Sequence, residues 1–89
     1  MDRYTIAIKN SCKPDLKKLK KSGLRKNFEE IVATLKDDPF APVHGFEKLQ
    51  PVSEGRYSRR LNVQHRIVYK VDEKRKVVEI YSAWSHYAR

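Results

Sequence analysis

The strongest constraint on the fold is an amphipathic helix predicted over residues 24–35. Five apolar residues recur there at spacings of four, three, one and three, which places them on one face of a 3.6-residue helix. The helix is expected to end at residues 37–39, because the residue before Pro39 avoids the helical region. The apolar residues are Leu24, Phe28, Ile31, Val32 and Leu35.

A shorter helix is predicted just before it. Asn10 or Ser11 can accept from free backbone N–H groups of the first turn, and Pro14 fits within that turn. Ser22 and Gly23 interrupt the helical pattern. The two helices therefore form an antiparallel hairpin with one apolar side that must be buried.

Strand-like segments lie on both sides of this hairpin and can cover it. Residues 4–9 alternate apolar and polar positions, and three further runs follow at about 56–62, 65–71 and 77–85. The predicted fold is α+β: a helical hairpin on a twisted, mainly antiparallel four-stranded sheet, in the order β-α-α-β-β-β. A length of 89 residues has room for one domain, 1–89, and residues 39–55 are expected to be its longest loop.

The charge of the chain points to a polyanionic partner, either nucleic acid or an acidic protein segment. Twenty Lys and Arg face 11 Asp and Glu, a net charge of +9. Eight of the basic residues and one acidic residue fall between Lys9 and Lys26. This cationic face is either ordinary solvation or a patch that follows an RNA backbone. The candidate ribosome-facing patch is Lys17, Lys18, Lys20, Lys21, Arg25 and Lys26.

Other residue counts restrict the chemistry and the location. One cysteine, Cys12, excludes an internal disulfide framework and a cysteine-rich zinc site, and it suits a reducing cytoplasm. No segment has the ~20 apolar residues that span a bilayer, so no membrane partner is expected. The three histidines are far apart in sequence, and we expect no metal site and no cofactor. His44 and His65 are interpreted as structural or surface residues.

The hairpin of residues 56–71 makes a specific prediction about two arginines. A three-residue turn at 62–64 pairs Leu61 with His65 and places Arg60 directly opposite Arg66. Like charges in this position repel, unless they bind an anion jointly. A slip of one residue would separate them onto opposite faces. The same register predicts a face covered by the helices, with Leu61, Val63, Ile67, Tyr69 and Val71.

Candidate proton-transfer groups lie at the end of the chain and in the long loop. His86 ends the last strand, has an unperturbed pKa near 6.5 and is followed by Tyr87. Glu47 is flanked by Phe46 and Leu49, which can hold its loop against the sheet. Together with the arginines, these groups indicate a metal-free phosphodiester site.

Four short motifs occur together: Phe-Glu-Lys-Leu at 46–49, Tyr-Ser-Arg-Arg at 57–60, His-Arg-Ile-Val-Tyr at 65–69, and His-Tyr at 86–87. With this spacing and element order, the whole chain resembles the YoeB/Txe branch of the RelE toxin superfamily. The resemblance implies a RelE-like fold and a cytoplasmic endoribonuclease that cuts mRNA in the decoding site of the bacterial ribosome. It also implies a cognate antitoxin as partner. The expected assembly is either a homodimer of this chain or a toxin–antitoxin hetero-oligomer.

The resemblance further implies roles for individual residues. Glu47 would take the proton from an RNA 2′-hydroxyl, and the product would end in a 2′,3′-cyclic phosphate. Arg66 would stabilise the charge on phosphorus, and His86 would protonate the leaving 5′-oxygen. Tyr87 would stack on or orient a nucleotide. Phosphate-binding roles fall on Arg59, Arg60 and Lys48.

Two features depart from the family pattern, and two other functions stay open. Gln50 stands where many members have a lysine, and Ala88 and Arg89 extend the chain beyond the His-Tyr pair. One alternative is a non-catalytic, ParE-like binding toxin of the same fold. The other is a small basic RNA-binding protein, which would bind free RNA and tolerate His86→Ala.

Overall fold

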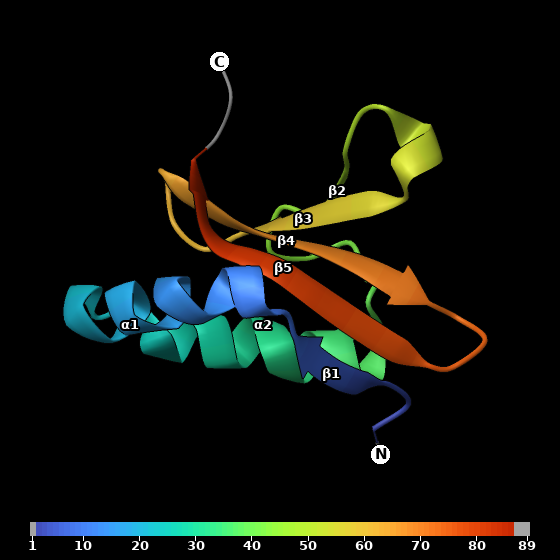
Figure 1. Ribbon diagram of the computed structural model, residues 1–89, viewed down its shortest axis with the longest axis horizontal. Helices are drawn as coiled ribbons and strands as arrows, with labels where there is room; N and C mark the ends of the chain where they lie inside the picture. The colour runs from blue at the N-terminus through green and yellow to red at the C-terminus, as the bar shows by residue number, and fades with distance from the viewer. Residues whose placement is uncertain (1, 87–89) are drawn as a thin grey trace.

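The computed structural model describes residues 2–86, and for residues 85 and 86 it describes the backbone alone. Two helices lie on one face of a five-stranded sheet of order β1-β5-β4-β3-β2 (Figure 1). β1 runs parallel to β5, and the other neighbours are antiparallel. The elements are β1 (Thr5–Ile8), α1 (Lys13–Ser22), α2 (Arg25–Asp37), β2 (Glu47–Lys48), β3 (Arg56–Arg60), β4 (His65–Asp72) and β5 (Val77–His86).

The helices match their predicted positions, but the start of α1 differs from the prediction. A 3-10 turn, η1 (Asn10–Cys12), precedes α1, and no side chain caps either element. The predicted cap from Asn10 or Ser11 is wrong, because the Ser11 hydroxyl instead donates to the carbonyl of Tyr81, at 2.8 Å. Gly23 ends α1 as predicted, with φ 76° and its N–H bonded to the carbonyl of Leu19.

The sheet contains one more strand than the four predicted. β2 lies inside the segment predicted to be loop, and it pairs with β3 through Glu47 opposite Ser58. The N–H of Leu49 extends this pairing by donating to the carbonyl of Arg56, at 2.9 Å. A two-residue strand has no periodicity of its own, so the sequence pattern does not reveal it.

The core lies between the helices and the sheet, as the amphipathic patterns predict. Ile31 and Leu35 of α2 meet Ile67 and Tyr69 of β4, and all four side chains are at most 1% exposed. One predicted member is wrong: Val63 is 83% exposed, because residues 62–64 turn away at the tip of the β3–β4 hairpin. The amide oxygen of Asn62 accepts from the N–H groups of Gln64 and His65 and fixes this turn.

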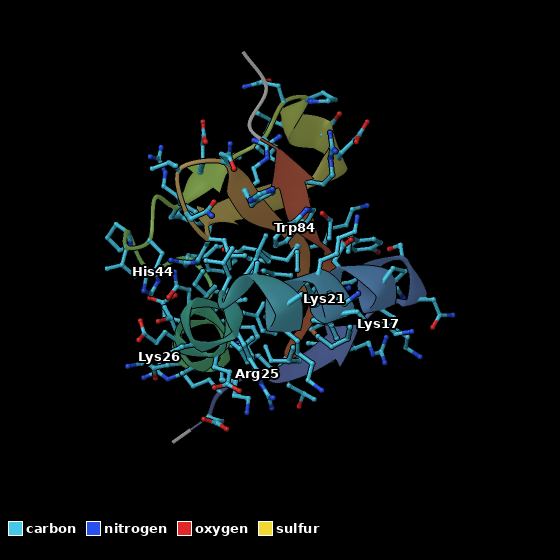
Figure 2. All side chains as sticks on the ribbon, turned by 90° about the vertical axis from the view of Figure 1, so that its left-hand side faces the viewer. Lys17, Lys21, Arg25, Lys26, His44 and Trp84 are labelled. Carbon is cyan, nitrogen blue, oxygen red and sulfur yellow. The ribbon has the colours of Figure 1, made fainter. Side chains whose placement is uncertain are left out.

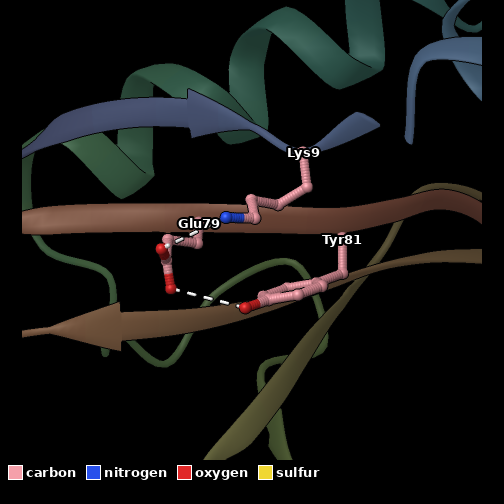
Figure 3. A network of polar contacts seen from close by, with 3 residues as sticks. All are labelled: Lys9, Glu79 and Tyr81. Atoms are coloured by element: carbon pink, nitrogen blue, oxygen red, sulfur yellow. Dashed lines mark hydrogen bonds and ion pairs between the residues drawn. The ribbon is translucent and has the colours of Figure 1, made fainter. Parts of the chain in front are cut away.

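Among residues 2–86, no α-helix packs on the other face of the sheet (Figure 1), and the strand positions on that face include Arg60, Lys70 and Glu79. On β5 this face presents Glu79. Its carboxylate accepts a long 3.5 Å hydrogen bond from the Tyr81 hydroxyl and forms an ion pair with Lys9 at 3.6 Å (Figure 3).

The pairing of β4 with β5 is irregular, with register shifts between Arg66 and Tyr69. The Asp15 carboxylate of α1 accepts from the N–H of Ala83, at 3.0 Å, and so ties the helix layer to this part of β5.

Cys12 predicts how the stability depends on alkaline pH. Burial and the nearby Asp15 carboxylate raise the pKa of the thiol from 9.0 to about 11. Its contribution to stability is therefore complete below pH 9 and is lost as the pH rises through 11. We expect urea denaturation to give a falling free energy of unfolding from pH 9 to 11, with a smaller fall in Cys12→Ala. An identical pH dependence in both proteins would contradict this assignment.

Candidate active site

Glu47 lies on the short edge strand β2, with an exposed side chain. The preceding residue, Phe46, stacks on Tyr57 of β3, with ring centroids 5.6 Å apart and planes at 19°. Phe40 meets both rings edge-on, at 6.5 and 5.4 Å. The expectation that Phe46 holds this segment against the sheet is confirmed. These ring contacts therefore fix the backbone from which the Glu47 side chain extends.

The predicted register of the two arginines is also confirmed. Arg60 on β3 lies directly opposite Arg66 on β4, so both side chains leave the same face of the sheet. Arg60 is exposed and Arg66 is half-buried. The backbone of Ser85 on β5 continues the row on the far side of Arg66.

Glu47 shares this face with the arginine pair. It lies opposite Ser58, and Ser58 is two residues from Arg60 on the same strand. Residues two apart on a strand point to the same side, and their Cα atoms are about 7 Å apart. The face is the one opposite the helices, because Ile67 and Tyr69, which alternate with Arg66 on β4, belong to the core.

The backbone of His86 ends β5 and pairs with His65, next to the row of Arg60 and Arg66. The side chain of His86 and the whole of Tyr87 lie outside the described residues, so their predicted roles stay predictions. His65 is structural: the residue is 6% exposed, and its ring stacks on Trp84 with centroids 4.0 Å apart. His44 is an exposed residue with φ 54°, in the loop that precedes β2 (Figure 2).

Arg59 corrects one sequence prediction. Its side chain is 0% exposed and lies on the helix side of the sheet, opposite Ile67. Its guanidinium donates to the backbone carbonyls of Pro39, Ala41 and Val43. A guanidinium without accessible surface cannot reach an RNA phosphate, so the predicted phosphate contact is wrong.

Lys48 lies on the other face of the sheet from Glu47. It pairs with Tyr57, and its ammonium group lies 6.0 Å from the centroid of that ring. The side chain is exposed, but the structure does not bring it together with the row of Arg60 and Arg66. Its predicted phosphate contact therefore has no support from this geometry.

The predicted basic patch lies on the helix layer, on α1 and α2; Figure 2 labels four of its residues, Lys17, Lys21, Arg25 and Lys26. All six side chains are exposed, which agrees with either interpretation of the patch. Arg25 forms an ion pair with Glu29, at 3.1 Å, so its charge is partly neutralised. The patch and the candidate site are therefore on different layers of the molecule, the patch on the helices and the site on the sheet.

Sequence reasoning did not identify Ser58, which lies beside Glu47. Ser58 is 0% exposed, and among the described residues its hydroxyl has no hydrogen-bond partner. A buried hydroxyl that stays unpaired costs roughly 1–3 kcal/mol. No local pattern marks such a position, because burial at a sheet surface depends on neighbouring strands.

Ser58→Ala is therefore expected to leave the free energy of unfolding unchanged or to raise it by about 1 kcal/mol. The smaller side chain removes an unpaired polar group and leaves the apolar contacts of the Cβ in place. Urea denaturation of both proteins measures the difference. A loss of stability in the variant would show that the hydroxyl has a partner.

Residues 2–86 contain neither a cluster of metal ligands nor a membrane-spanning helix. No group of three or more His, Cys, Asp or Glu side chains in that range has the arrangement to hold a metal ion. No helix in that range is long and apolar enough to cross a bilayer.

Comparison with known proteins gives a consistent family assignment. Residues 13–87 match the model of the YoeB-like toxin of bacterial type II toxin–antitoxin systems. The YoeB dimer from Staphylococcus aureus is 28% identical, with a TM-score of 0.80 over 96% of this chain and 99% of that one. The same toxin in the heterotetrameric YoeB–YefM complex has 28% identity, a TM-score of 0.74 and the same two coverages.

A more distant structure has the same fold. The YoeB/ParE toxin from Agrobacterium tumefaciens is 23% identical, with a TM-score of 0.80 over 93% of this chain and 99% of that one. This likeness shows the fold alone. No curated protein matches the sequence.

Proposed function

Because the chain belongs to the YoeB-like toxins of bacterial type II toxin–antitoxin systems, we propose that it is an endoribonuclease that cuts mRNA in the decoding site of the ribosome. The observation that carries the proposal is the shared face of Glu47, Arg60 and Arg66. A carboxylate and two facing guanidiniums on one rigid surface match the needs of phosphodiester cleavage.

In the proposed reaction, the nucleophile is a hydroxyl of the RNA itself. Glu47 takes the proton from the 2′-hydroxyl, and the resulting oxygen attacks the adjacent phosphorus. The bond from phosphorus to the 5′-oxygen breaks, and His86 donates a proton to that oxygen. The products carry a 2′,3′-cyclic phosphate and a 5′-hydroxyl, so a protein nucleophile is not needed.

The arginine pair supplies the charge stabilisation in this proposal. Two negative charges accumulate on the phosphoryl oxygens in the transition state. The pairing of Arg60 with Arg66 across β3 and β4 supports a joint contact of the two arginines with one phosphate. Arginine suits the task because its planar fork meets two oxygens and stays charged. Tyr87 would orient a nucleotide beside the two guanidiniums.

The proposed partners are the bacterial ribosome, mRNA and a cognate antitoxin. The S. aureus relative forms a complex with the antitoxin YefM and also a dimer. By analogy, we expect this chain to form a toxin–antitoxin hetero-oligomer, with a neutral-to-acidic antitoxin that covers part of the net +9 charge. The site of action is then the cytoplasm, where ribosomes translate.

Primer extension on one mRNA, with and without programmed ribosomes, tests this function. We expect a cut within the codon in the decoding site that requires ribosomes and disappears in His86→Ala. Equal cutting of free RNA would contradict the dependence on ribosomes. Absence of any cut by folded, antitoxin-free protein would favour a binding toxin of the same fold.

A further inference from the structure

The buried guanidinium of Arg59 is the least expected feature of the sheet. A charged side chain is rarely 0% exposed, because its desolvation is costly unless the group is fully hydrogen-bonded. Among the described residues, its acceptors are three backbone carbonyls and one phenol, all of them uncharged. These hydrogen bonds offset part of that cost, and they join β3 to a segment that is distant in sequence.

The three carbonyls belong to one segment, the loop between α2 and β2. Nη1 donates to Ala41 at 2.8 Å and to Val43 at 2.7 Å, and Nη2 donates to Pro39 at 2.9 Å. Nε donates to the hydroxyl of Tyr69 at 3.2 Å, and that hydroxyl donates to the same Pro39 carbonyl at 2.7 Å. Arg59 and Tyr69 therefore form one network that holds residues 39–43 against the sheet.

This loop leads directly to the candidate general base. The guanidinium carbon of Arg59 lies 4.9 Å from the centroid of the Phe46 ring. Phe46 is the residue before Glu47, so the same side chain fixes both the start and the end of the loop. These contacts therefore position the backbone of Glu47.

The loop also meets the candidate phosphate-binding residue Arg60. The carbonyl of His44 accepts a 2.6 Å hydrogen bond from the N–H of Arg60. Gly45 has φ +64°, and a Cβ placed there would lie 3.1 Å from the Cβ of Arg60. The loop thus packs closely along Arg60, and its position limits where that side chain can go.

We propose that Arg59 is a positioning residue, whose buried guanidinium fixes residues 39–46 and thereby places Glu47 and Arg60 for cleavage. The effect on cleavage rests on the proposed function. The claim that Arg59 fixes residues 39–46 does not depend on it. Arginine is required because its rigid fork directs donors to several carbonyls at once, whereas a lysine ammonium is a compact group with three donors. The pKa of Tyr69 is raised to about 12, chiefly by burial, so its hydroxyl keeps the proton that it donates to Pro39.

Three variants test this role at increasing severity: Tyr69→Phe, Arg59→Lys and Arg59→Met. Leu35→Ala is the matched control, because Leu35 is equally buried but belongs to the helix layer rather than to the loop. For each protein, urea denaturation gives the stability, and cleavage of mRNA on programmed ribosomes gives kcat and KM. Hydrogen exchange of the amides of Val43, Phe46 and Arg60 reports the loop, with the amide of Lys9 as reference.

We expect kcat to fall about 10²-fold in Arg59→Met, because small displacements of catalytic groups cost that much. KM should change by less than about threefold, because the substitution leaves the exposed basic residues of the helices unchanged. Arg59→Lys should retain part of the rate, and Tyr69→Phe should lie between lysine and wild type. Exchange should accelerate in residues 39–46 but not at Lys9. Leu35→Ala should lower stability while kcat stays near that of wild type.

Unchanged loop exchange in folded Arg59→Lys and Tyr69→Phe would overturn the proposal. So would a loss of kcat that merely follows stability and is equally large in Leu35→Ala. If Arg59→Met does not fold, the two milder variants decide. If the wild-type protein does not cut RNA at all, the proposed function fails. The hydrogen-exchange data alone then decide whether Arg59 fixes residues 39–46.

Discussion

Arg66→Ala is expected to lower single-turnover cleavage of ribosome-bound mRNA by about 10²–10³-fold. Arg66 lies opposite Arg60, so in the proposed reaction its guanidinium contacts the phosphate whose charge increases in the transition state. Removing it leaves one guanidinium of the pair. Arg66→Lys should recover only part of the rate, because a lysine cannot form the paired contact of a guanidinium with two oxygens.

Lys70→Ala is the matched control for this experiment. Lys70 lies on the same strand and the same face as Arg66, but it pairs with Arg56 and Glu79 rather than with Arg60. The change in net charge is identical, so the loss of general electrostatic attraction is shared by both variants. Equal loss of cleavage in Lys70→Ala and Arg66→Ala would contradict a specific role for Arg66.

Neutralising the lysines of α1 is expected to weaken ribosome association rather than the chemical step. Lys17, Lys18, Lys20 and Lys21 are exposed on α1, in the helix layer, whereas Glu47 lies on strand β2 of the sheet. If these four follow the RNA backbone, changing them to glutamine removes about 3 from the slope of log affinity against log salt. The variant should also lose the corresponding sensitivity of about 10²-fold between roughly 50 and 200 mM salt. A salt titration of ribosome binding measures both quantities.

A second fourfold variant controls for net charge. Lys36, Lys74, Arg75 and Lys76 lie outside the basic patch, and changing them to glutamine removes the same four charges. It should keep most of the salt slope. Equal effects of the two variants would mean that the chain is attracted by its overall charge, and that the lysines of α1 are ordinary solvated residues.

The fold was predictable from the sequence where one periodicity dominated. The helix over 24–35, the end of α1 at Gly23 and the register that faces Arg60 with Arg66 all depend on local patterns. β2 was not predictable, because two residues carry no periodicity and pair through tertiary contacts. Val63 was misplaced because the alternation was extended into a turn, where side chains no longer follow the pleat.

The site was predictable in part, and Arg59 shows the limit. Arg59 and Arg60 are adjacent and chemically identical, and neighbouring residues on a strand face opposite sides of the sheet. The register therefore decides that one is exposed beside Arg66 while the other is buried under the loop of residues 39–46. From the sequence alone, Arg59 and Arg60 were both predicted to bind phosphate. The buried network of Arg59 and Tyr69 needs the path of that loop, which no local pattern specifies.

The most direct test of the account replaces one oxygen of the substrate. Two mRNAs are placed in programmed ribosomes, one all-ribose and one with a single 2′-deoxynucleotide just 5′ of the cut. The account predicts that the all-ribose mRNA is cut to a 2′,3′-cyclic phosphate end and that the deoxy-substituted mRNA is not cut there. Cleavage of the deoxy-substituted mRNA at the same bond, or a product with a 3′-hydroxyl, would contradict attack by the 2′-hydroxyl and the role of Glu47 in activating it.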